Sequence, residues 1–380
     1  MNAYITRIAA YLPNAPVSND EIENVLGLVN QKPSRSRRIV LRNNGIQQRH
    51  YVICPTTGTP KYSNASLTAG AIRKLFPTPQ ELEQVECLSV GTSNPDQLLP
   101  NHGVMVHGEL GNPACEVVAT AGICLAGTTA LKYAWMSVLT GQCTKAVATG
   151  SEVASLNLRA QRFDAETDAR IQALEENPEL AFEKDFLRWM LSDAAGAMLI
   201  EPTPNTNALS LRIDWIDVFS YAHEMPVCMY AGAIKDHGGS FTGWSHFDHD
   251  AIGAQSVMAL KQDVKLLNAN VVEYCLVKPL QSIQEKRQLK ADDIDWFLPH
   301  MSSYFFEQPI AEGLSKIGLT IPKDKWFTNL KNRGNTGSAS IYLMLEELFN
   351  HKHLAKGQTI LCFVPESGRF SSAYIHLTVV

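Results

Sequence analysis

The sequence has 380 residues, of which 45% are hydrophobic and 19% charged, a composition typical of a folded globular protein and not of a disordered chain. The formal net charge of −5 excludes a strong positive field that would attract nucleic acid. The sequence has neither an apolar run of the roughly 20 residues needed to span a bilayer nor a basic leader followed by an apolar segment, so we expect a cytoplasmic protein.

Strands and helices alternate along the first half of the chain. The helix over residues 19–27 is expected to begin at Asn19 as its capping residue. Residues 157–190 are charged and helix-prone, and they are interpreted as an insertion. The short apolar runs predict strands at 3–10, 85–90, 115–118, 146–149 and 194–200, and the remaining helices are expected at 66–75, 100–111 and 125–139.

A similar alternation begins again at about residue 206. Residues 251–284 predict one long helix or two. Strands are expected at 209–219, 296–298, 359–365 and 373–379, and helices at 303–317 and 335–351. Two similar halves, residues 1–205 and 206–380, therefore predict a layered α/β protein whose short strands are covered on both faces.

One of the eight cysteines has a setting unlike that of the others. No C-x-x-C pair occurs, so a metal site made of cysteines is not expected. Cys124 follows a strand and the turn Ala121-Gly122, and it opens the helix 125–139. Unpaired N–H groups and a partial positive charge at a helix N-terminus favour a thiolate. Cys124 is therefore a candidate nucleophile, and a buried structural cysteine is the alternative.

Two further residues lie where ligands bind in α/β sheets. His300 follows the apolar strand 296–298, and a side chain at the carboxyl end of a buried strand faces the usual ligand crevice. Asn335 lies in a turn of small residues, 334–340 (GNTGSAS), which opens a helix. Taken singly, a structural histidine and a helix cap remain alternative interpretations of these two residues.

Several segments in the same order resemble those of the 3-oxoacyl-[acyl-carrier-protein] synthase III family of the thiolase superfamily. Residues 119–127 (ATAGICLAG) resemble its nucleophile segment, 298–300 its histidine strand and 334–340 its asparagine turn. Further similar segments are 43–50, 150–152 and 192–197. The resemblance implies an α/β thiolase-like fold, five-layered αβαβα, with two duplicated halves at 1–205 and 206–380, and a homodimer.

The resemblance also implies roles for these residues. Cys124 would carry an acyl group taken from a thioester, while His300 and Asn335 would hydrogen-bond the carbonyl of the second thioester and stabilise its enolate. The backbone N–H groups of Cys124 and Gly368 would form the oxyanion hole. This chemistry requires no cofactor and no metal, and the expected partners are acyl thioesters on acyl carrier protein or coenzyme A.

The sequence departs from the family pattern at several places. Residues 301–303 (MSS) follow His300, and the segment 366–369 (ESGR) stands where the family is glycine-rich. The basic region 30–42 lacks the tryptophan of many members. We interpret three of its side chains as a docking site for a carrier protein, namely Arg35, Arg37 and Arg38. A solvated loop is the alternative interpretation. Glu152, after a buried strand, is interpreted as a hydrogen-bonded buried carboxylate, with an acid–base role as the alternative.

The insertion is similar to that of the branch of the family that makes dialkylresorcinols and related cyclohexanediones in secondary metabolism. That resemblance implies a Claisen condensation of a β-ketoacyl with an α,β-unsaturated acyl thioester, followed by cyclisation. The alternative is decarboxylative condensation with malonyl-acyl carrier protein to initiate fatty-acid or polyketide chains. A non-catalytic partner subunit, a thioesterase and a degradative thiolase remain other classes, although Cys362 is poorly placed to be the second cysteine of a thiolase.

Overall fold

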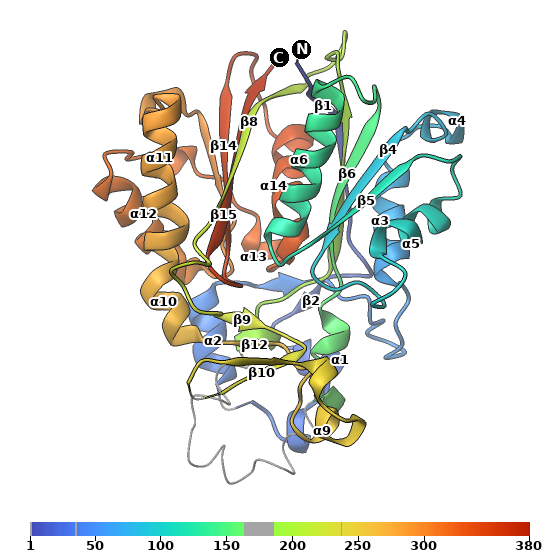
Figure 1. Ribbon diagram of the computed structural model, residues 1–380, viewed down its shortest axis with the longest axis vertical. Coiled ribbons are helices and arrows are strands. Elements are labelled where there is room, and N and C mark those ends of the chain that lie inside the picture. Colours follow the sequence, from blue (N-terminus) through green and yellow to red (C-terminus); the bar gives the residue numbers. More distant parts are fainter. Residues whose placement is uncertain (1, 35, 163–185, 237) are drawn as a thin grey trace.

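The computed structural model describes residues 2–34, 36–162, 186–236 and 238–380. Figure 1 shows helices α6 (Leu125–Leu139) and α14 (Ser340–His351) in the middle, with strands on both sides and further helices outside the strands. Helix α6 packs against strands of both flanks, and α14 packs against the first flank. The predicted layering of helix, sheet, helix, sheet and helix is therefore confirmed.

The strands on both sides belong to one hydrogen-bonded sheet of nine, in the order β13-β14-β15-β8-β1-β7-β6-β4-β5. Two residue pairs, between β1 and β8, join the two flanks. The strands are β1 (Tyr4–Tyr11), β4 (Cys87–Thr92), β5 (Glu116–Ala121), β6 (Ala146–Glu152), β7 (Ala194–Glu201), β8 (Leu211–Ser220), β13 (Trp296–Pro299), β14 (Thr359–Glu366) and β15 (Ser371–Val379).

The two flanks repeat one pairing pattern. β4 pairs parallel with β6, β6 antiparallel with β7, and β7 antiparallel with β1. In the second flank β13 pairs parallel with β14, β14 antiparallel with β15, and β15 antiparallel with β8. β5 has no counterpart among the described strands of the second flank and forms the outer edge of its own flank. The similarity of the two halves that the sequence predicts is visible in this order of strands.

Several helices begin at a residue whose side chain caps them. Ser63, Asn101 and Asp263 each accept a backbone N–H of the helix that follows them, which satisfies one of its otherwise free donors. The other helices are α1 (Ile22–Leu26), α2 (Arg37–Asn44), α3 (Asn64–Arg73), α4 (Pro79–Leu82), α5 (His102–Leu110), α9 (His249–Ala254), α10 (Val264–Val272), α11 (Lys278–Arg287), α12 (Glu307–Lys316) and α13 (Leu330–Arg333).

Short elements complete the chain. The short strands are β2 (Val17–Ser18), β3 (Gln48–Arg49), β9 (Met229–Tyr230), β10 (Ala233–Lys235), β11 (Phe241–Gly243) and β12 (Lys261–Gln262). The 3-10 turns are η1 (Val29–Gln31), η2 (Ser155–Asn157), η3 (Ala160–Arg162), η4 (Trp244–His246), η6 (Ala291–Asp293), η7 (Tyr304–Phe306), η8 (Lys323–Lys325) and η9 (Gly337–Ala339), and η5 (Glu273–Val277) is a π-helical turn.

One local prediction is wrong. Asn19 does not cap a helix: α1 begins later, and the Asn19 amide oxygen instead accepts a hydrogen bond from the buried guanidinium of Arg49. Residues 251–284 contain two helical segments, as one of the two expected alternatives has it: the short α9, and a longer run in which the π-helical turn η5 joins α10 to α11. Strand β12 lies between these two segments.

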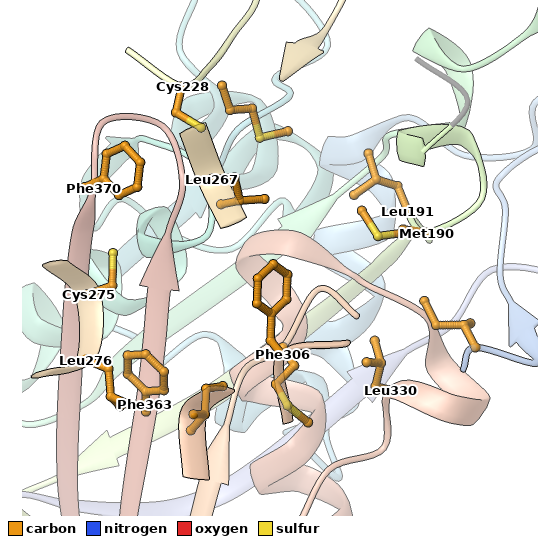
Figure 2. Close-up of a cluster of buried hydrophobic side chains, with 14 of the residues drawn as sticks. Met190, Leu191, Cys228, Leu267, Cys275, Leu276, Phe306, Leu330, Phe363 and Phe370 are labelled. Carbon is orange, nitrogen blue, oxygen red and sulfur yellow. The ribbon is translucent and has the colours of Figure 1, made fainter. Parts of the chain in front are cut away.

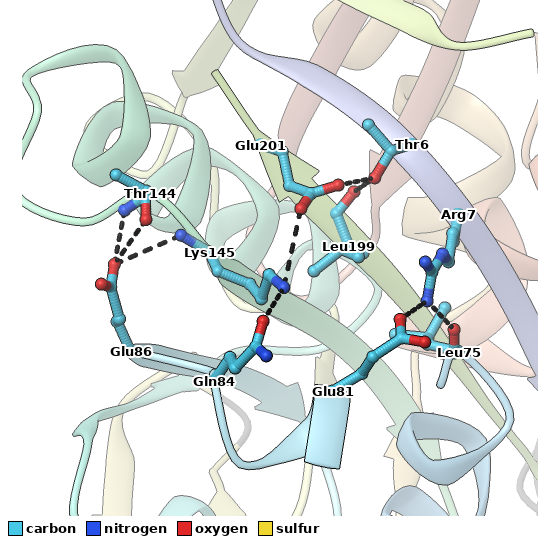
Figure 3. A network of polar contacts seen from close by, with 10 residues as sticks. All are labelled: Thr6, Arg7, Leu75, Glu81, Gln84, Glu86, Thr144, Lys145, Leu199 and Glu201. Atoms are coloured by element: carbon cyan, nitrogen blue, oxygen red, sulfur yellow. Dashed lines mark hydrogen bonds and ion pairs between the residues drawn. The ribbon is translucent and has the colours of Figure 1, made fainter. Parts of the chain in front are cut away.

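A polar network ties the first-flank strands together at one end (Figure 3). Lys145 contacts Gln84 at 2.8 Å and Glu201 at 4.0 Å, and Arg7 donates to Glu81 at 2.6 Å. Gln84 and Lys145 lie just before β4 and β6, and Glu201 ends β7, whereas Arg7 lies within β1 and Glu81 on α4. Gln84, Lys145 and Glu201 therefore lie at the opposite end of the parallel strands from the segments that carry the candidate site.

Among the described residues no helix is both long enough and apolar enough to cross a bilayer. Most of the insertion predicted near 157–190 lies outside the described residues, and the part that is described contains η3 and the start of the segment leading into β7.

Candidate active site

Cys124, His300 and Asn335 all line one cavity of about 400 Å³. They come from distant parts of the sequence, yet the structure brings them together where β5, β13 and the segment after α13 end. This is the convergence that the sequence motifs imply. The volume lies in the range of pockets that enclose a small-molecule ligand.

Backbone hydrogen bonds fix the position of each of the three residues. Cys124 occupies the N-cap position of α6. The N–H of His300 donates to the carbonyl of Phe363 on β14 at 2.8 Å. The N–H of Asn335 donates to the carbonyl of Met190, and its carbonyl accepts the N–H of Ser192, both at 2.9 Å. Asn335 is thus bound on both sides to the segment that leads into β7.

The predicted thiolate of Cys124 is wrong for the free enzyme. Burial raises the pKa of the Cys124 thiol well above its ordinary value, and the negative charges of Glu366 and Glu152 raise the pKa further. The N-terminus of a helix favours an anion, but the N–H groups at the start of α6 already bind another carboxylate. The Glu366 carboxylate accepts the N–H groups of Ile123 at 2.8 Å and Leu125 at 2.9 Å.

Sequence reasoning missed Glu366 as part of the site. The residue lies at the end of β14, at the turn into β15, and it reaches the residues on both sides of Cys124. A signal was present, because a glutamate stands there in a segment that is glycine-rich in the family that the chain resembles. A glycine offers no side chain to a neighbouring helix, whereas a glutamate can occupy the helix N–H groups.

His300 is a neutral imidazole at physiological pH. It is 3% exposed, and its burial lowers the pKa to about 4. A neutral imidazole still has one ring N–H, so His300 can donate a hydrogen bond to a carbonyl oxygen. The amide of Asn335 contributes a second set of donors, while its Oδ1 accepts the N–H of Gly337 at 3.0 Å.

Glu152 also lines the cavity and is completely hydrogen-bonded. One carboxylate oxygen accepts the hydroxyl of Ser93 and the amide of Asn94, and the other accepts the N–H and hydroxyl of Ser338. Burial raises the pKa of Glu152 to about 7. The interpretation as a hydrogen-bonded buried carboxylate agrees with these contacts, and they link β6 to the turn that carries Asn335.

Gly368 lies in the turn between β14 and β15. Its carbonyl accepts the N–H groups of Cys228 at 2.9 Å and Met229 at 3.3 Å. Ser367, its neighbour, lines the cavity, whereas Gly368 is not among the lining residues. The role of Gly368 in the oxyanion hole therefore remains a prediction.

The arginines predicted to receive a carrier protein are not equivalent. Arg37 is bound within the chain: its guanidinium donates to Asp20 at 2.7 Å and to the carbonyl of Asn19 at 3.0 Å, and it lies over the ring of Trp189. Arg38 is exposed. Arg35 lies outside the described residues. Among the described pair, only Arg38 presents its side chain to solvent in the way that docking would require.

Apolar side chains form much of the cavity wall. Figure 2 shows Phe306 and Phe363 from the second half near Leu267 and Leu276 of the α10–α11 region, with Met190 and Leu191 on a separate segment. All six residues line the cavity. The described lining residues include no lysine and no arginine. Such a wall suits an acyl chain, because burial of its methylene groups is favourable.

The chain is similar to known proteins over nearly its whole length. The sequence profile described as 3-oxoacyl-[acyl-carrier-protein (ACP)] synthase III C terminal matches residues 284–373. Beta-ketoacyl-[acyl-carrier-protein] synthase III of Koribacter versatilis is 26% identical over 379 residues, which cover 98% of this chain and 96% of the relative. The protein of the same name from Roseobacter denitrificans is 26% identical over 347 residues, which cover 91% of this chain and 89% of the relative.

Solved structures share the fold at low sequence identity. AbyA1, a tetronic acid condensing enzyme, aligns with a TM-score of 0.76 and 19% identity over 99% of each chain. OleA of Xanthomonas campestris aligns with a TM-score of 0.74 and 17% identity, over 100% of this chain and 98% of OleA. FabH of Pseudomonas aeruginosa aligns with a TM-score of 0.71 and 17% identity, over 100% of this chain and 98% of FabH.

These similarities agree with the architecture and with the cavity described above. The profile covers the segment that contains His300 and Asn335, and the relatives extend the match to the segment that contains Cys124. The chain is therefore a β-ketoacyl-[acyl-carrier-protein] synthase III-like acyltransferase, a condensing enzyme with the thiolase-like fold.

Proposed function

We propose that this condensing enzyme carries an acyl group on Cys124 and joins a β-ketoacyl thioester to an α,β-unsaturated acyl thioester. Cyclisation then gives a cyclohexanedione, the precursor of a dialkylresorcinol. The observation that carries this proposal is the single cavity that combines Cys124, His300 and Asn335 with apolar walls. The nucleophile and the two carbonyl-binding side chains are thereby available to two acyl thioesters in one site.

The reaction proceeds in two parts at this site. The sulfur of Cys124 attacks the first thioester, and the tetrahedral intermediate is stabilised by backbone N–H groups, for which Cys124 and Gly368 are the candidates. The neutral His300 and the Asn335 amide then bind the carbonyl oxygen of the second thioester and stabilise its enolate. The second thioester loses a proton from its α-carbon as the enolate forms, and the enolate carbon attacks the acyl-cysteine. The bond between the acyl carbon and the sulfur then breaks, and the departing Cys124 thiolate takes up one proton, so the thiol is regenerated with no net gain or loss of protons.

The charges around the cavity favour uncharged acyl groups. The described lining residues offer no lysine or arginine to a malonyl carboxylate, and His300 is uncharged at neutral pH. Two carboxylates, Glu152 and Glu366, lie close enough to Cys124 to raise the pKa of its thiol. Repulsion from these groups disfavours a malonyl carboxylate near Cys124. A β-ketoacyl and an enoyl thioester carry no such charge.

Decarboxylative condensation with malonyl-acyl carrier protein is the second candidate. It is favoured by the names of the curated relatives, which are beta-ketoacyl-[acyl-carrier-protein] synthases III. In contrast, the structural neighbours include a tetronic acid condensing enzyme and an OleA solved with lauric acid and lauroyl-CoA. The fold therefore accommodates more than one pair of acyl substrates.

A paired-substrate assay separates the two candidates. The purified enzyme is incubated with a β-ketoacyl and an enoyl thioester, and separately with an acyl thioester and malonyl-acyl carrier protein, and products are identified by mass. We expect a condensed cyclic product only in the first incubation, and none from Cys124→Ala. Consumption of malonyl-acyl carrier protein with release of carbon dioxide, while the first pair is untouched, would contradict the proposal.

We also propose that the enzyme is a homodimer formed across β5. This strand is the outer edge of the first flank, and edge strands offer unpaired backbone groups to a second strand. Exposed apolar side chains also occur in this half of the chain: Leu98 is 64% exposed, Leu99 85% and Met136 47%. Sedimentation should show a dimer that Leu99→Asp weakens, whereas a monomeric parent protein would contradict this arrangement.

A further inference from the structure

We propose that the Glu366 carboxylate accepts the proton of the Cys124 thiol during acyl transfer and returns it to the departing thiol. This inference rests on the proposed acyl-Cys124 intermediate and adds the group that makes its formation possible. Cys124 is a thiol in the free enzyme, because burial and nearby negative charge disfavour its thiolate. A thiol is a poor nucleophile, so a proton acceptor is needed beside it.

The geometry of Glu366 suits this task. One carboxylate oxygen, Oε2, accepts two hydrogen bonds, from the N–H groups of Ile123 and Leu125 at 2.8 and 2.9 Å. These bonds fix the carboxylate across the segment that contains Cys124. The other oxygen, Oε1, has no hydrogen-bond partner among the residues that the structure describes, and no described cation forms an ion pair with Glu366. A fixed carboxylate with one free oxygen can receive a proton without first breaking a contact.

The other titratable groups near Cys124 are less suited. Both oxygens of Glu152 are occupied by donors from Ser93, Asn94 and Ser338. His300 is a weak base, because burial lowers its pKa to about 4. Cys275 is itself a buried thiol with a raised pKa. Among the described residues, Glu366 remains as the carboxylate that binds the residues on both sides of Cys124 and has one oxygen without a hydrogen-bond partner.

The step balances without any additional reagent. The Cys124 S–H proton moves to Glu366, and a bond forms between the sulfur and the carbonyl carbon of the acyl donor. The tetrahedral intermediate then collapses, and the bond between that carbon and the donor sulfur breaks. The departing thiolate takes the proton from Glu366, which regenerates the carboxylate and leaves acyl-Cys124. No oxidation or reduction occurs.

Glu366→Gln provides the test, because glutamine keeps an oxygen for the two N–H groups but cannot accept the proton. Two reactions of Cys124 are compared in a Cys115→Ala background, so that the other partly exposed cysteine is absent. Alkylation by iodoacetamide reports the thiolate alone, whereas single-turnover transfer from lauroyl-CoA requires proton transfer to and from the sulfur. Intact-mass analysis follows both reactions.

The two rates should change in opposite directions. We expect lauroyl transfer to fall on the order of 100-fold, the usual contribution of a positioned proton acceptor. Alkylation at neutral pH should become faster, because loss of the negative charge lowers the pKa of the Cys124 thiol. Parallel loss of both reactions would show a merely structural role and would overturn the inference, as would unchanged lauroyl transfer.

Two companion measurements keep the result interpretable. Glu366→Ala should recover lauroyl transfer when sodium formate is added, because a small carboxylate can replace the missing one. Glu152→Gln should not combine slower lauroyl transfer with faster alkylation. If Glu152→Gln showed this combination and Glu366→Gln did not, the assignment to Glu366 would be overturned. If the parent enzyme accepted no acyl group from lauroyl-CoA or from any of the thioesters tested above, the proposed function itself would fail, and this inference with it.

Discussion

The hydroxyl of Tyr342 on α14 donates a hydrogen bond to the backbone carbonyl of Gly127 on α6, at 2.8 Å. The two central helices approach closely at this point: a Cβ atom on Gly127 would lie 2.4 Å from the carbonyl oxygen of Ser338. α6 begins next to Cys124, and α14 follows the turn that contains Asn335. The contact between Tyr342 and Gly127 thus links the helix that begins next to Cys124 to the helix that follows Asn335.

Tyr342→Phe should reduce the free energy of unfolding by about 1–2 kcal/mol, because the carbonyl of Gly127 loses a buried partner. Chemical denaturation measures this change. Tyr4→Phe is the matched control, since the one hydrogen bond of the Tyr4 hydroxyl within the described part of the chain comes from the exposed side chain of Asn2, at 3.3 Å. An equal effect of both substitutions would contradict the importance of the contact between helices.

Acyl thioesters should label Cys124 and no other cysteine. Of the eight cysteines, Cys115 and Cys124 are partly exposed and the others are buried. Intact-mass analysis should therefore find one acyl group per chain in the parent protein and in Cys115→Ala, and none in Cys124→Ala. Loading that survives Cys124→Ala would show that a different residue is the nucleophile.

His300→Ala and Asn335→Ala should separate the two parts of the reaction. Both variants should still load Cys124, because neither side chain is assigned to acyl transfer. Condensation should fall on the order of 100- to 1,000-fold, the usual cost of removing one hydrogen-bond donor from a developing oxyanion. A quenched assay that measures loading and product in the same sample tests this separation, and equal loss of both steps would argue against it.

The buried carboxyl of Glu152 should make stability depend on pH in a predictable direction. Burial raises its pKa from 4.5 to about 7, so the folded state binds this proton more tightly than the unfolded state does. The stability of the parent protein relative to Glu152→Gln should therefore fall as pH rises from about 5 to about 8, by about 2–3 kcal/mol. Denaturant titrations of both proteins at the two pH values measure the difference, in which any pH-independent effect of the substitution cancels. A difference in unfolding free energy between the two proteins that stays constant or increases as pH rises would contradict this prediction.

Arg38→Glu should weaken acyl transfer from an acyl carrier protein while transfer of the same acyl group from coenzyme A changes little. The reason is that carrier proteins are acidic partners, for which reversal of an exposed positive charge replaces attraction by repulsion. Lys356→Glu is the control, because Lys356 is exposed next to the start of β14, whereas the cavity lies at the other end of that strand. Equal transfer from both donors in Arg38→Glu would refute docking at this residue.

The strands, and the meeting of Cys124, His300 and Asn335 in one cavity, could be predicted from the sequence for physical reasons. Strands covered on both faces are continuous apolar runs, and turns of small residues mark their ends, so segments such as 194–200 and 359–365 are visible without a structure. Cys124 and His300 follow the ends of β5 and β13, and Asn335 lies in a turn of small residues after α13. Their convergence could therefore be expected from the order of the elements.

What the sequence did not predict depends on contacts between distant residues. The protonation state of Cys124 is set by its burial and by Glu366, and the latter lies more than 240 residues further along the chain. Arg37 appears basic and free in the sequence, but it is bound by Asp20 and by the carbonyl of Asn19. Local patterns such as helix caps and charge runs contain no information on either arrangement.

The pairing of Glu366 with the N–H groups of Ile123 and Leu125 also bears on how the protein is made. A ribosome releases the nucleophile segment long before the last strand pair, since 241 positions separate Leu125 from Glu366. A nascent chain therefore contains Cys124 without the carboxylate that we assign to its activation. Acyl-transfer competence would then arise only after β14 joins the sheet, which spares the unfinished polypeptide from premature acylation.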